Sequence, residues 1–365
     1  MKAYTNARVF TGTKFTNLAV LTDKNIVTDL VTAETIPLNA EIIDLQNKIL
    51  APAFIDIQIY GGNGKLFSDE LSVAAIQSTY EYCLAGGASQ FYITLATNSL
   101  EVFYKGIDAV REYWKQGGKG MPGLHLEGPY INPLKKGAHI EKYIKNPTVK
   151  EVTELLTYGK DVIKIITLAP EQVDAEIIQL LLNNGIVVSA GHSNANYKQA
   201  TAAFDNGITT ATHLFNAMSP FQHREPGLVG AIYNHPKVMS SIVPDGIHVD
   251  FAALRISKKI MQERLFIITD AVTPTSGGDY PHVLKGDRYT MPDGTLSGSA
   301  LTMIKSVKNL VTEAGIELEE ALRMASLYPA QVVGLNKRYG KIEKGFAAAL
   351  IVFDDAFSVT EVIVD

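Results

Sequence analysis

Three residues of types that can bind metal ions each lie at or near the end of an apolar, strand-like run of this chain. Glu127 ends the run GLHLEG, His192 ends IVVSAGH and His213 lies in TTATHLFN. One glutamate and two histidines, with a fourth position left open for water, form a common ligand set of catalytic zinc sites. The three residues form no local motif, so this interpretation requires that the ends of their runs lie close together in the folded protein.

Each of the three residues also has an ordinary structural explanation. His192 could cap the following helix, His213 could be a satisfied core residue, and Glu127 could pair with a lysine. The metal-site interpretation is preferred because all three residues fall at strand ends, and a lone buried carboxylate or imidazole is costly. His125, two residues before Glu127, would project to the same side one layer deeper and support the site rather than bind the ion.

Other polar residues at similar positions could act on a substrate. Asp270 ends the run FIITDAV, where a carboxylate beside a metal can take a proton from water and return it to a leaving group, although it could simply be an N-cap. His139 and His248 lie in loops beyond strand ends and could hydrogen-bond a substrate. Arg224, in the loop HREPGLVG, suits a phosphate but could be a surface charge.

The stretch DGTLSGSALTM is similar to a glycine-rich turn that leads into a helix. Backbone N–H groups in such a turn can bind a polar ligand, so Leu296 and Ser297 are candidate substrate contacts. The pattern does not by itself indicate a nucleotide, and no Walker A or GxGxxG fingerprint accompanies it.

Eight apolar runs follow Pro52 and alternate with helix-like stretches, as in βα units around a parallel sheet. The runs cover residues 54–61, 89–97, 123–128, 163–170, 186–192, 209–216, 240–248 and 266–272. This pattern predicts a (β/α)8 barrel, in which active sites lie at the C-terminal ends of the strands. The barrel would therefore bring the candidate residues to one face.

The two ends of the chain have a different, β-rich pattern. Short β-like runs separated by turn residues fill the N-terminal segment, and GKIEKGFAAALIVFDDAFSVTEVIVD closes the chain. We expect these ends to pair in a small β-sandwich domain of residues 1–50 and 340–365, beside a catalytic barrel domain of residues 51–339.

Composition excludes several classes of partner. The net charge of −5 provides no basic surface for nucleic acid or anionic membranes, so a small molecule is the expected partner. Cys83 is the single cysteine, which is typical of a reducing compartment. No stretch reaches the ~18 apolar residues that span a bilayer, and the N-terminus lacks a signal-peptide pattern. These features predict a cytoplasmic protein.

Six motifs together closely resemble those of the N-acetylglucosamine-6-phosphate deacetylases of the amidohydrolase superfamily. They are HLEGPYINPLKKGAH, SAGHSNA, THLFNAMSPFQHREPGLVGA, PDGIHVD, ITDAV and LSGSALTM, in the family's order across residues 52–303. The resemblance implies a (β/α)8 barrel with a β-sandwich domain from both termini, usually in a homodimer. It also implies that the substrate is an amino-sugar phosphate that loses acetate.

The same resemblance implies individual roles. Glu127, His192 and His213 would bind one divalent ion, with zinc expected and Fe²⁺ or another ion possible, and Asp270 would act as acid and base. His139 would help to stabilise the reacting carbonyl oxygen. Substrate contacts are implied for His139, Asn216, Ala217, Arg224 and His248, with Arg224 reaching the neighbouring subunit's site.

The chain departs from the wider superfamily at the end of the first strand. Many amidohydrolases have HxH there to hold a second metal, whereas this chain has Gln58-Ile59-Tyr60, and Lys164 lies too early in its strand to be a carboxylated ligand. One ion is therefore expected, with Gln58 hydrogen-bonding its water. Two alternatives remain open: another amidohydrolase that acts on a cyclic substrate, and a sugar-phosphate-binding protein without activity.

Overall fold

The computed structural model describes residues 1–275 and 277–364, which form two compact units. One unit contains Met1–Asp56, Cys83–Gln90 and the described part of Thr302–Asp365, and the other contains Ile57–Tyr82 and Phe91–Leu301. The predicted domain limits, 1–50 with 340–365 and 51–339, remain a proposal, and Asp365 lies outside the described residues. No helix in the described ranges is long and apolar enough to cross a membrane.

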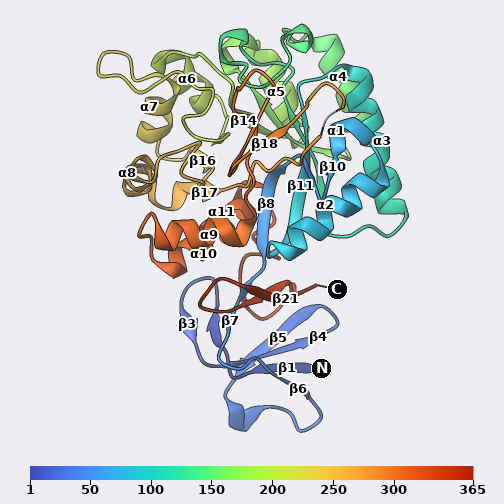
Figure 1. Cartoon of the computed structure of the whole chain (residues 1–365), viewed down its shortest axis with the longest axis vertical. Coiled ribbons are helices and arrows are strands. Elements are labelled where there is room, and N and C mark those ends of the chain that lie inside the picture. The colour runs from blue at the N-terminus through green and yellow to red at the C-terminus, as the bar shows by residue number, and fades with distance from the viewer. Residues whose placement is uncertain (276, 365) are drawn as a thin grey trace. The chain divides into compact units, whose positions relative to one another are not determined.

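Eight parallel strands form the predicted barrel (Figure 1). In sheet order they are β8 (Phe54–Ile59), β11 (Ala88–Ala96), β12 (Gly123–Glu127), β13 (Ile163–Leu168), β14 (Val187–Ala190), β15 (Thr210–Ala211), β16 (Met239–Ile242) and β17 (Leu265–Ile267). The sheet closes where Ile59 bridges to Ala271, and the Asp270 N–H donates to the Gln58 carbonyl at 3.0 Å. Each predicted run overlaps one of these strands, three of which begin one residue before the run, and the predicted fold is confirmed.

Helices follow the strands and lie around them (Figure 1). They are α2 (Val73–Ala85), α3 (Leu100–Lys115), α4 (Val149–Gly159), α5 (Ala175–Asn183), α6 (Tyr197–Asp205), α7 (Gly227–Asn234) and α8 (Phe251–Met261). Side-chain caps fix where several begin: Ser99 accepts from the Val102 N–H, and Asn196 and Gln199 form a capping box. These caps fix the helix ends of the loops 97–99 and 191–196, and the second loop contains His192.

The buried strand β12 contains a histidine that serves the fold. His125 Nδ1 lies 2.9 Å from the Ile57 carbonyl, and its Nε2 lies 2.8 Å from Thr167 Oγ1. A carbonyl can only accept, so Nδ1 carries the hydrogen and Nε2 accepts from the threonine. Burial lowers the pKa of His125 to about 4, so the ring is neutral. His125 therefore links β12 to β8 and β13.

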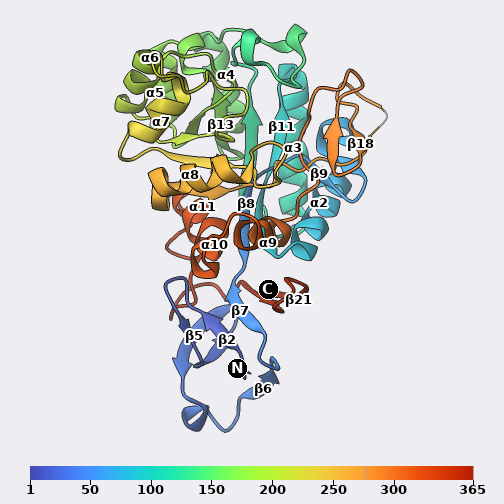
Figure 2. The same cartoon turned by 60° about the vertical axis from the view of Figure 1, so that its left-hand side comes forward.

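The terminal segments build two sheets in the other unit (Figure 2). One contains β5 (Ile26–Val31), β4 (Ala19–Asp23), β1 (Lys2–Thr5) and β6 (Glu41–Asp44); the other contains β21 (Val359–Ile363), β20 (Leu350–Phe353), β7 (Ile49–Pro52), β2 (Arg8–Phe10) and β3 (Phe15–Thr16). C-terminal β20 pairs antiparallel with β7, and Val20, Leu50 and Leu350 belong to one buried cluster. The prediction that both ends of the chain form one β structure is confirmed.

The remaining elements are short. In the barrel unit they are β9 (Gly61–Gly62), β10 (Lys65–Leu66), α1 (Phe67–Glu70) and the hairpin of β18 (Val283–Lys285) and β19 (Arg288–Thr290). Helices α9 (Met303–Thr312), α10 (Leu318–Ala325) and α11 (Leu327–Val332) belong to the same unit as the terminal sheets.

Candidate active site

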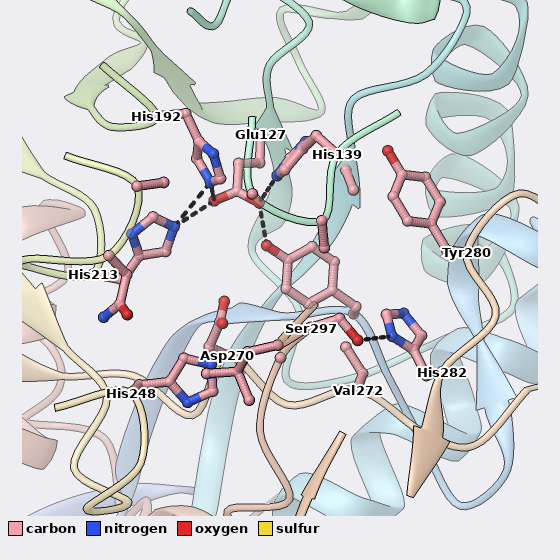
Figure 3. A pocket seen from close by; sticks show the side chains of 18 of the residues that line it. Glu127, His139, His192, His213, His248, Asp270, Val272, Tyr280, His282 and Ser297 are labelled. Atoms are coloured by element: carbon pink, nitrogen blue, oxygen red, sulfur yellow. Dashed lines mark hydrogen bonds and ion pairs between the residues drawn. The ribbon is translucent and has the colours of Figure 1, made fainter. Parts of the chain in front are cut away.

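The three predicted metal ligands meet at the C-terminal ends of their strands (Figure 3). Glu127 Oε1 lies 3.0 Å from His213 Nε2 and 3.3 Å from His192 Nε2, and the two nitrogens are 3.1 Å apart. All three side chains are buried. Three residues from β12 and from the turns after β14 and β15 therefore point at one small region of space.

The hydrogen bonds of His192 show that this region suits a cation. Its Nδ1 lies 2.9 Å from the Lys135 carbonyl and must carry the hydrogen, which leaves a lone pair on Nε2 of the neutral ring. That lone pair faces Glu127 Oε1 and His213 Nε2. A cation among these three atoms would offset the repulsion between the lone pair and the carboxylate, as would a hydrogen on His213 Nε2. One carboxylate oxygen and two imidazole nitrogens fit zinc or a similar divalent ion.

His139 also reaches Glu127 but has a different role. Its Nε2 is 3.0 Å from Glu127 Oε2, so on proximity alone Glu127, His139 and His192 could form a metal group. The Thr97 backbone N–H, however, lies 3.2 Å from His139 Nδ1, and an N–H can only donate. The hydrogen of the neutral ring is therefore on Nε2, and His139 is a donor to Glu127 rather than a ligand.

The electrostatics of Glu127 follow from these neighbours. Burial alone would raise its pKa, but the adjacent His139, 3.0 Å from Oε2, holds that pKa well below its usual range. The carboxylate is thus ionised and can bind a cation.

Four of the predicted functional residues have strained backbone conformations, among them Ala217 with a φ of 50°. The φ angles of His192, His213 and Asp270 are 48°, 38° and 54°, in the left-handed region that costs roughly 1 kcal/mol for residues with a side chain. Neighbouring strands hold two of them, since the His213 N–H donates to Ser241 Oγ at 2.7 Å and the Asp270 N–H to the Gln58 carbonyl. Such strain is typical of functional sites.

Gly128 explains the sharp turn after Glu127. Its φ is 83°, and a Cβ at this position would lie 2.1 Å from Thr97 Oγ1. Only glycine fits without moving Thr97, which positions His139.

Asp270 connects to the ligand cluster through Gln58. Gln58 Nε2 lies 2.8 Å from Asp270 Oδ1, 3.0 Å from Glu127 Oε1 and 2.8 Å from the Tyr60 hydroxyl. The amide NH₂ therefore lies among two carboxylates and a phenol, with two hydrogens for three acceptors. Burial, followed by the charge of Glu127, raises the pKa of Tyr60 well above its usual value, so Tyr60 remains a phenol.

One pocket contains most of the predicted substrate contacts. Its lining includes Glu127, His139, His192, His213, Asn216, Ala217, His248, Asp270, Leu296 and Ser297. His248 is held by Asp245, whose Oδ2 is 2.6 Å from Nδ1, so Nε2 remains available for a ligand. Figure 3 shows His248 and Asp270 on the opposite side of the pocket from His192.

Arg224 is the predicted substrate contact that does not line this pocket. It is exposed, and the described residues that line the pocket include neither arginine nor lysine. A phosphate bound there would need a positive partner from outside the lining.

Sequence reasoning missed one wall of the pocket. Tyr280 and His282 line it, the Tyr280 hydroxyl donates to the Thr97 carbonyl at 2.5 Å, and His282 Nδ1 lies 2.9 Å from Ser297 Oγ. These residues lie beyond the end of the eighth strand, where no spacing rule applies. Thr97 and Tyr60 do lie at strand ends, but their residue types did not indicate a role.

His282 should make stability depend on pH. Burial lowers its pKa to about 4, below the unfolded value of about 6.5, so the unfolded chain binds more protons between these values. The contribution of His282 to the free energy of unfolding is present above pH 6.5 and is lost as the pH falls toward 4. The free-energy difference of unfolding between the wild type and His282→Asn should therefore change by roughly 2 to 3 kcal/mol between pH 7.5 and 4.5. Denaturant titrations at both pH values measure it, and a constant difference would contradict the assignment.

Comparisons with known proteins identify the family of this chain. Residues 49–365 match the Amidohydrolase family. The N-acetylglucosamine-6-phosphate deacetylase of Haemophilus influenzae is 36% identical over 360 residues, which cover 96% of this chain and 94% of that protein.

Two solved structures show the same similarity. The crystal structure of N-acetylglucosamine-6-phosphate deacetylase from Pasteurella multocida is 36% identical, with a TM-score of 0.96 over 100% of this chain and 98% of that one. An aspartate-to-alanine mutant of the Mycobacterium smegmatis enzyme, in complex with N-acetyl-D-glucosamine-6-phosphate, is 29% identical, with a TM-score of 0.91 over 99% and 97%. The chain therefore belongs to the amidohydrolase family and, within it, to the group of N-acetylglucosamine-6-phosphate deacetylases.

Proposed function

We propose that this protein hydrolyses the acetamide of N-acetylglucosamine 6-phosphate to glucosamine 6-phosphate and acetate. The observation that carries the proposal is the position of Asp270 beside the buried Glu127, His192 and His213 cluster, in a pocket that also contains the expected substrate contacts. A divalent ion held by those three residues would polarise the acyl oxygen and lower the pKa of the attacking water toward ~7.

Asp270 and His139 perform the proton and charge chemistry in this proposal. Asp270 accepts the proton of the attacking water and delivers it to the amide nitrogen, which leaves as the free amine of the sugar. The His139 Nε2–H, positioned by Thr97, donates to the acyl oxygen as negative charge develops there, as in an oxyanion hole.

The sugar is held by the other lining residues in the proposed complex. His248 presents Nε2 from its fixed position on Asp245, and Asn216, Ala217, Leu296 and Ser297 surround the same space. The role expected for Gln58, a hydrogen bond to the attacking water, agrees with its position between Asp270 and Glu127.

Arg224 is proposed to bind the phosphate of a substrate held by a second subunit. Supporting this, Arg224 is exposed, whereas the described lining residues of its own pocket provide no permanent cation. The homodimer, zinc as the native ion and a cytoplasmic location remain predictions from the sequence. Sedimentation analysis and metal analysis of the purified protein test the first two.

Replacing Arg224 by alanine should raise the KM for N-acetylglucosamine 6-phosphate by about 10- to 100-fold, because a charge-assisted hydrogen bond contributes about 1.5–3 kcal/mol. The preference over unphosphorylated N-acetylglucosamine should shrink by the same factor. Steady-state kinetics with both sugars measure it, with Arg338→Ala as a control arginine. An unchanged preference would remove Arg224 from the phosphate site.

Mixed dimers test whether Arg224 acts across subunits. Arg224→Ala protein and Asp270→Asn protein would each be impaired alone. If a subunit with intact Arg224 completes the neighbouring site, a reassociated mixture should regain turnover at low substrate concentration. No recovery in verified mixed dimers would place Arg224 in its own site or remove it.

Acetate release from a panel of N-acyl sugar phosphates tests the proposed activity. We expect N-acetylglucosamine 6-phosphate to be turned over, and the galactosamine epimer in the panel measures how strictly the pocket selects the sugar. Binding of the substrate without acetate release by the metal-loaded protein would instead support a binding protein.

A further inference from the structure

Tyr60 is a pocket residue to which the chemistry above gives no task. It directly follows β8, its N–H donates to the Ala271 carbonyl at 2.9 Å and its own carbonyl accepts from the Phe67 N–H at 2.9 Å. The backbone position is thus fixed on both sides. Its side chain lies on the same side of the strand as Gln58 and lines the pocket.

The direction of the hydrogen bonds of Tyr60 can be worked out from its partners. Gln58 Nε2 lies 2.8 Å from the hydroxyl and cannot accept its hydrogen, while its own two hydrogens are shared among Tyr60, Asp270 Oδ1 and Glu127 Oε1. The single hydroxyl hydrogen is then directed to its other partner, Glu127 Oε2. Tyr60 is therefore a donor to the carboxylate of a predicted metal ligand.

The two oxygens of Glu127 have separate sets of partners. Oε1 faces the Nε2 atoms of His213 and His192 at 3.0 and 3.3 Å, whereas Oε2 accepts from Tyr60 and from His139 Nε2 at 3.0 Å. We propose that Tyr60 is a positioning residue: its hydroxyl occupies Oε2 so that Glu127 binds the metal ion through Oε1 alone.

This role becomes more important if His139 acts as proposed, a step that rests on the proposed function. His139 has one Nε2 hydrogen and cannot donate to Glu127 and to the substrate's acyl oxygen at the same time. When it turns to the substrate, Tyr60 keeps Oε2 satisfied and prevents the carboxylate from rotating. Tyr60 thus holds the orientation of Glu127 without His139, so the Nε2 hydrogen of His139 is available for the substrate.

The test removes only the hydroxyl, with Tyr60→Phe. Hydrogen-bond partners of metal ligands typically contribute 10- to 100-fold to metal affinity, so the Kd for Zn²⁺ should rise by that factor. Competition with a chromogenic chelator, on metal-depleted protein without substrate, measures it. The visible spectrum of the Co²⁺-loaded variant should also change, because a second carboxylate oxygen at the ion raises its coordination number.

Tyr130→Phe is the matched control. Tyr130 is also buried and its hydroxyl also donates to a glutamate, Glu151, at 2.9 Å, but Glu151 does not line the pocket. This variant should keep its Zn²⁺ affinity within about threefold, since it loses a similar hydrogen bond away from the metal ligands. A far-ultraviolet spectrum and a melting curve establish that both variants fold.

The metal-binding result, read beside the kinetics, separates positioning from direct catalysis. At saturating metal, Tyr60→Phe should lower kcat by about 10-fold and leave the KM within about twofold, because the substrate contacts are intact. Unchanged Zn²⁺ affinity with an unchanged Co²⁺ spectrum would overturn the proposal, whether or not kcat falls. Because metal binding is measured without substrate, a failure of the proposed deacetylase activity would not affect this readout.

Discussion

Replacing Asp270 by asparagine should lower kcat by about 10²- to 10⁴-fold, the usual contribution of a positioned general acid or base. The amide cannot accept the proton of water and has none to give to the leaving amine. Asparagine keeps the shape, can accept from Gln58 at Oδ1 as Asp270 does at 2.8 Å, and tolerates the φ of 54° at this position. The substitution therefore tests the chemistry with little disturbance of the fold.

Metal content, the KM and the melting temperature serve as controls for Asp270→Asn. We expect metal content near that of the wild type and substrate binding that is retained, so the loss should be in kcat. Steady-state acetate release measures kcat and the KM, and metal analysis of the same sample measures the metal content. Turnover within about tenfold of the wild type would contradict the acid and base role, since that is below the usual range.

Replacing Glu127 by glutamine should remove the metal and, with it, roughly 10³-fold or more of kcat/KM, because the ion contributes several kcal/mol to transition-state stabilisation. The variant loses the negative charge that faces His192 and His213. Its amide NH₂ would also oppose one of the donors that now point at the carboxylate, which include Tyr60, His139 and Gln58.

Glu151→Gln is the control for this substitution. Glu151 accepts from Tyr130 and pairs with Lys145 at 2.6 Å, outside the pocket lining. Metal analysis after dialysis should find the wild-type content in Glu151→Gln and little metal in Glu127→Gln. Full metal content in Glu127→Gln would exclude the predicted ligand set.

The barrel could be predicted because its signals are local in the sequence. The alternation of apolar runs with amphipathic stretches indicates which segments are buried. The rule that active sites of such barrels lie at the C-terminal ends of the strands then selected Glu127, His192, His213 and Asp270 without any information on contacts. The two β-rich ends could be recognised for the same reason, since strand and turn residues alternate along them.

Side-chain contacts between distant residues could not be predicted in this way. His125 and Glu127 lie two residues apart on one strand, yet whether either is a ligand depends on partners such as Thr167 and His213, which come from other strands. The positive φ values of the site residues arise from strand-to-loop geometry, which the sequence does not display at non-glycine positions. Tyr60 and His282 were missed because their function follows from packing rather than residue type.

The most direct test of the account is a metal titration of the depleted wild-type protein, with acetate release from N-acetylglucosamine 6-phosphate followed at each addition. Activity should be absent without metal, rise in proportion to added Zn²⁺ and level off at one ion per chain, because the proposed site of Glu127, His192 and His213 would hold one ion and Gln58 and Tyr60 stand in place of a second ligand pair. Full activity in the metal-depleted protein, or activity that levels off only at two ions per chain, would contradict the single-ion site.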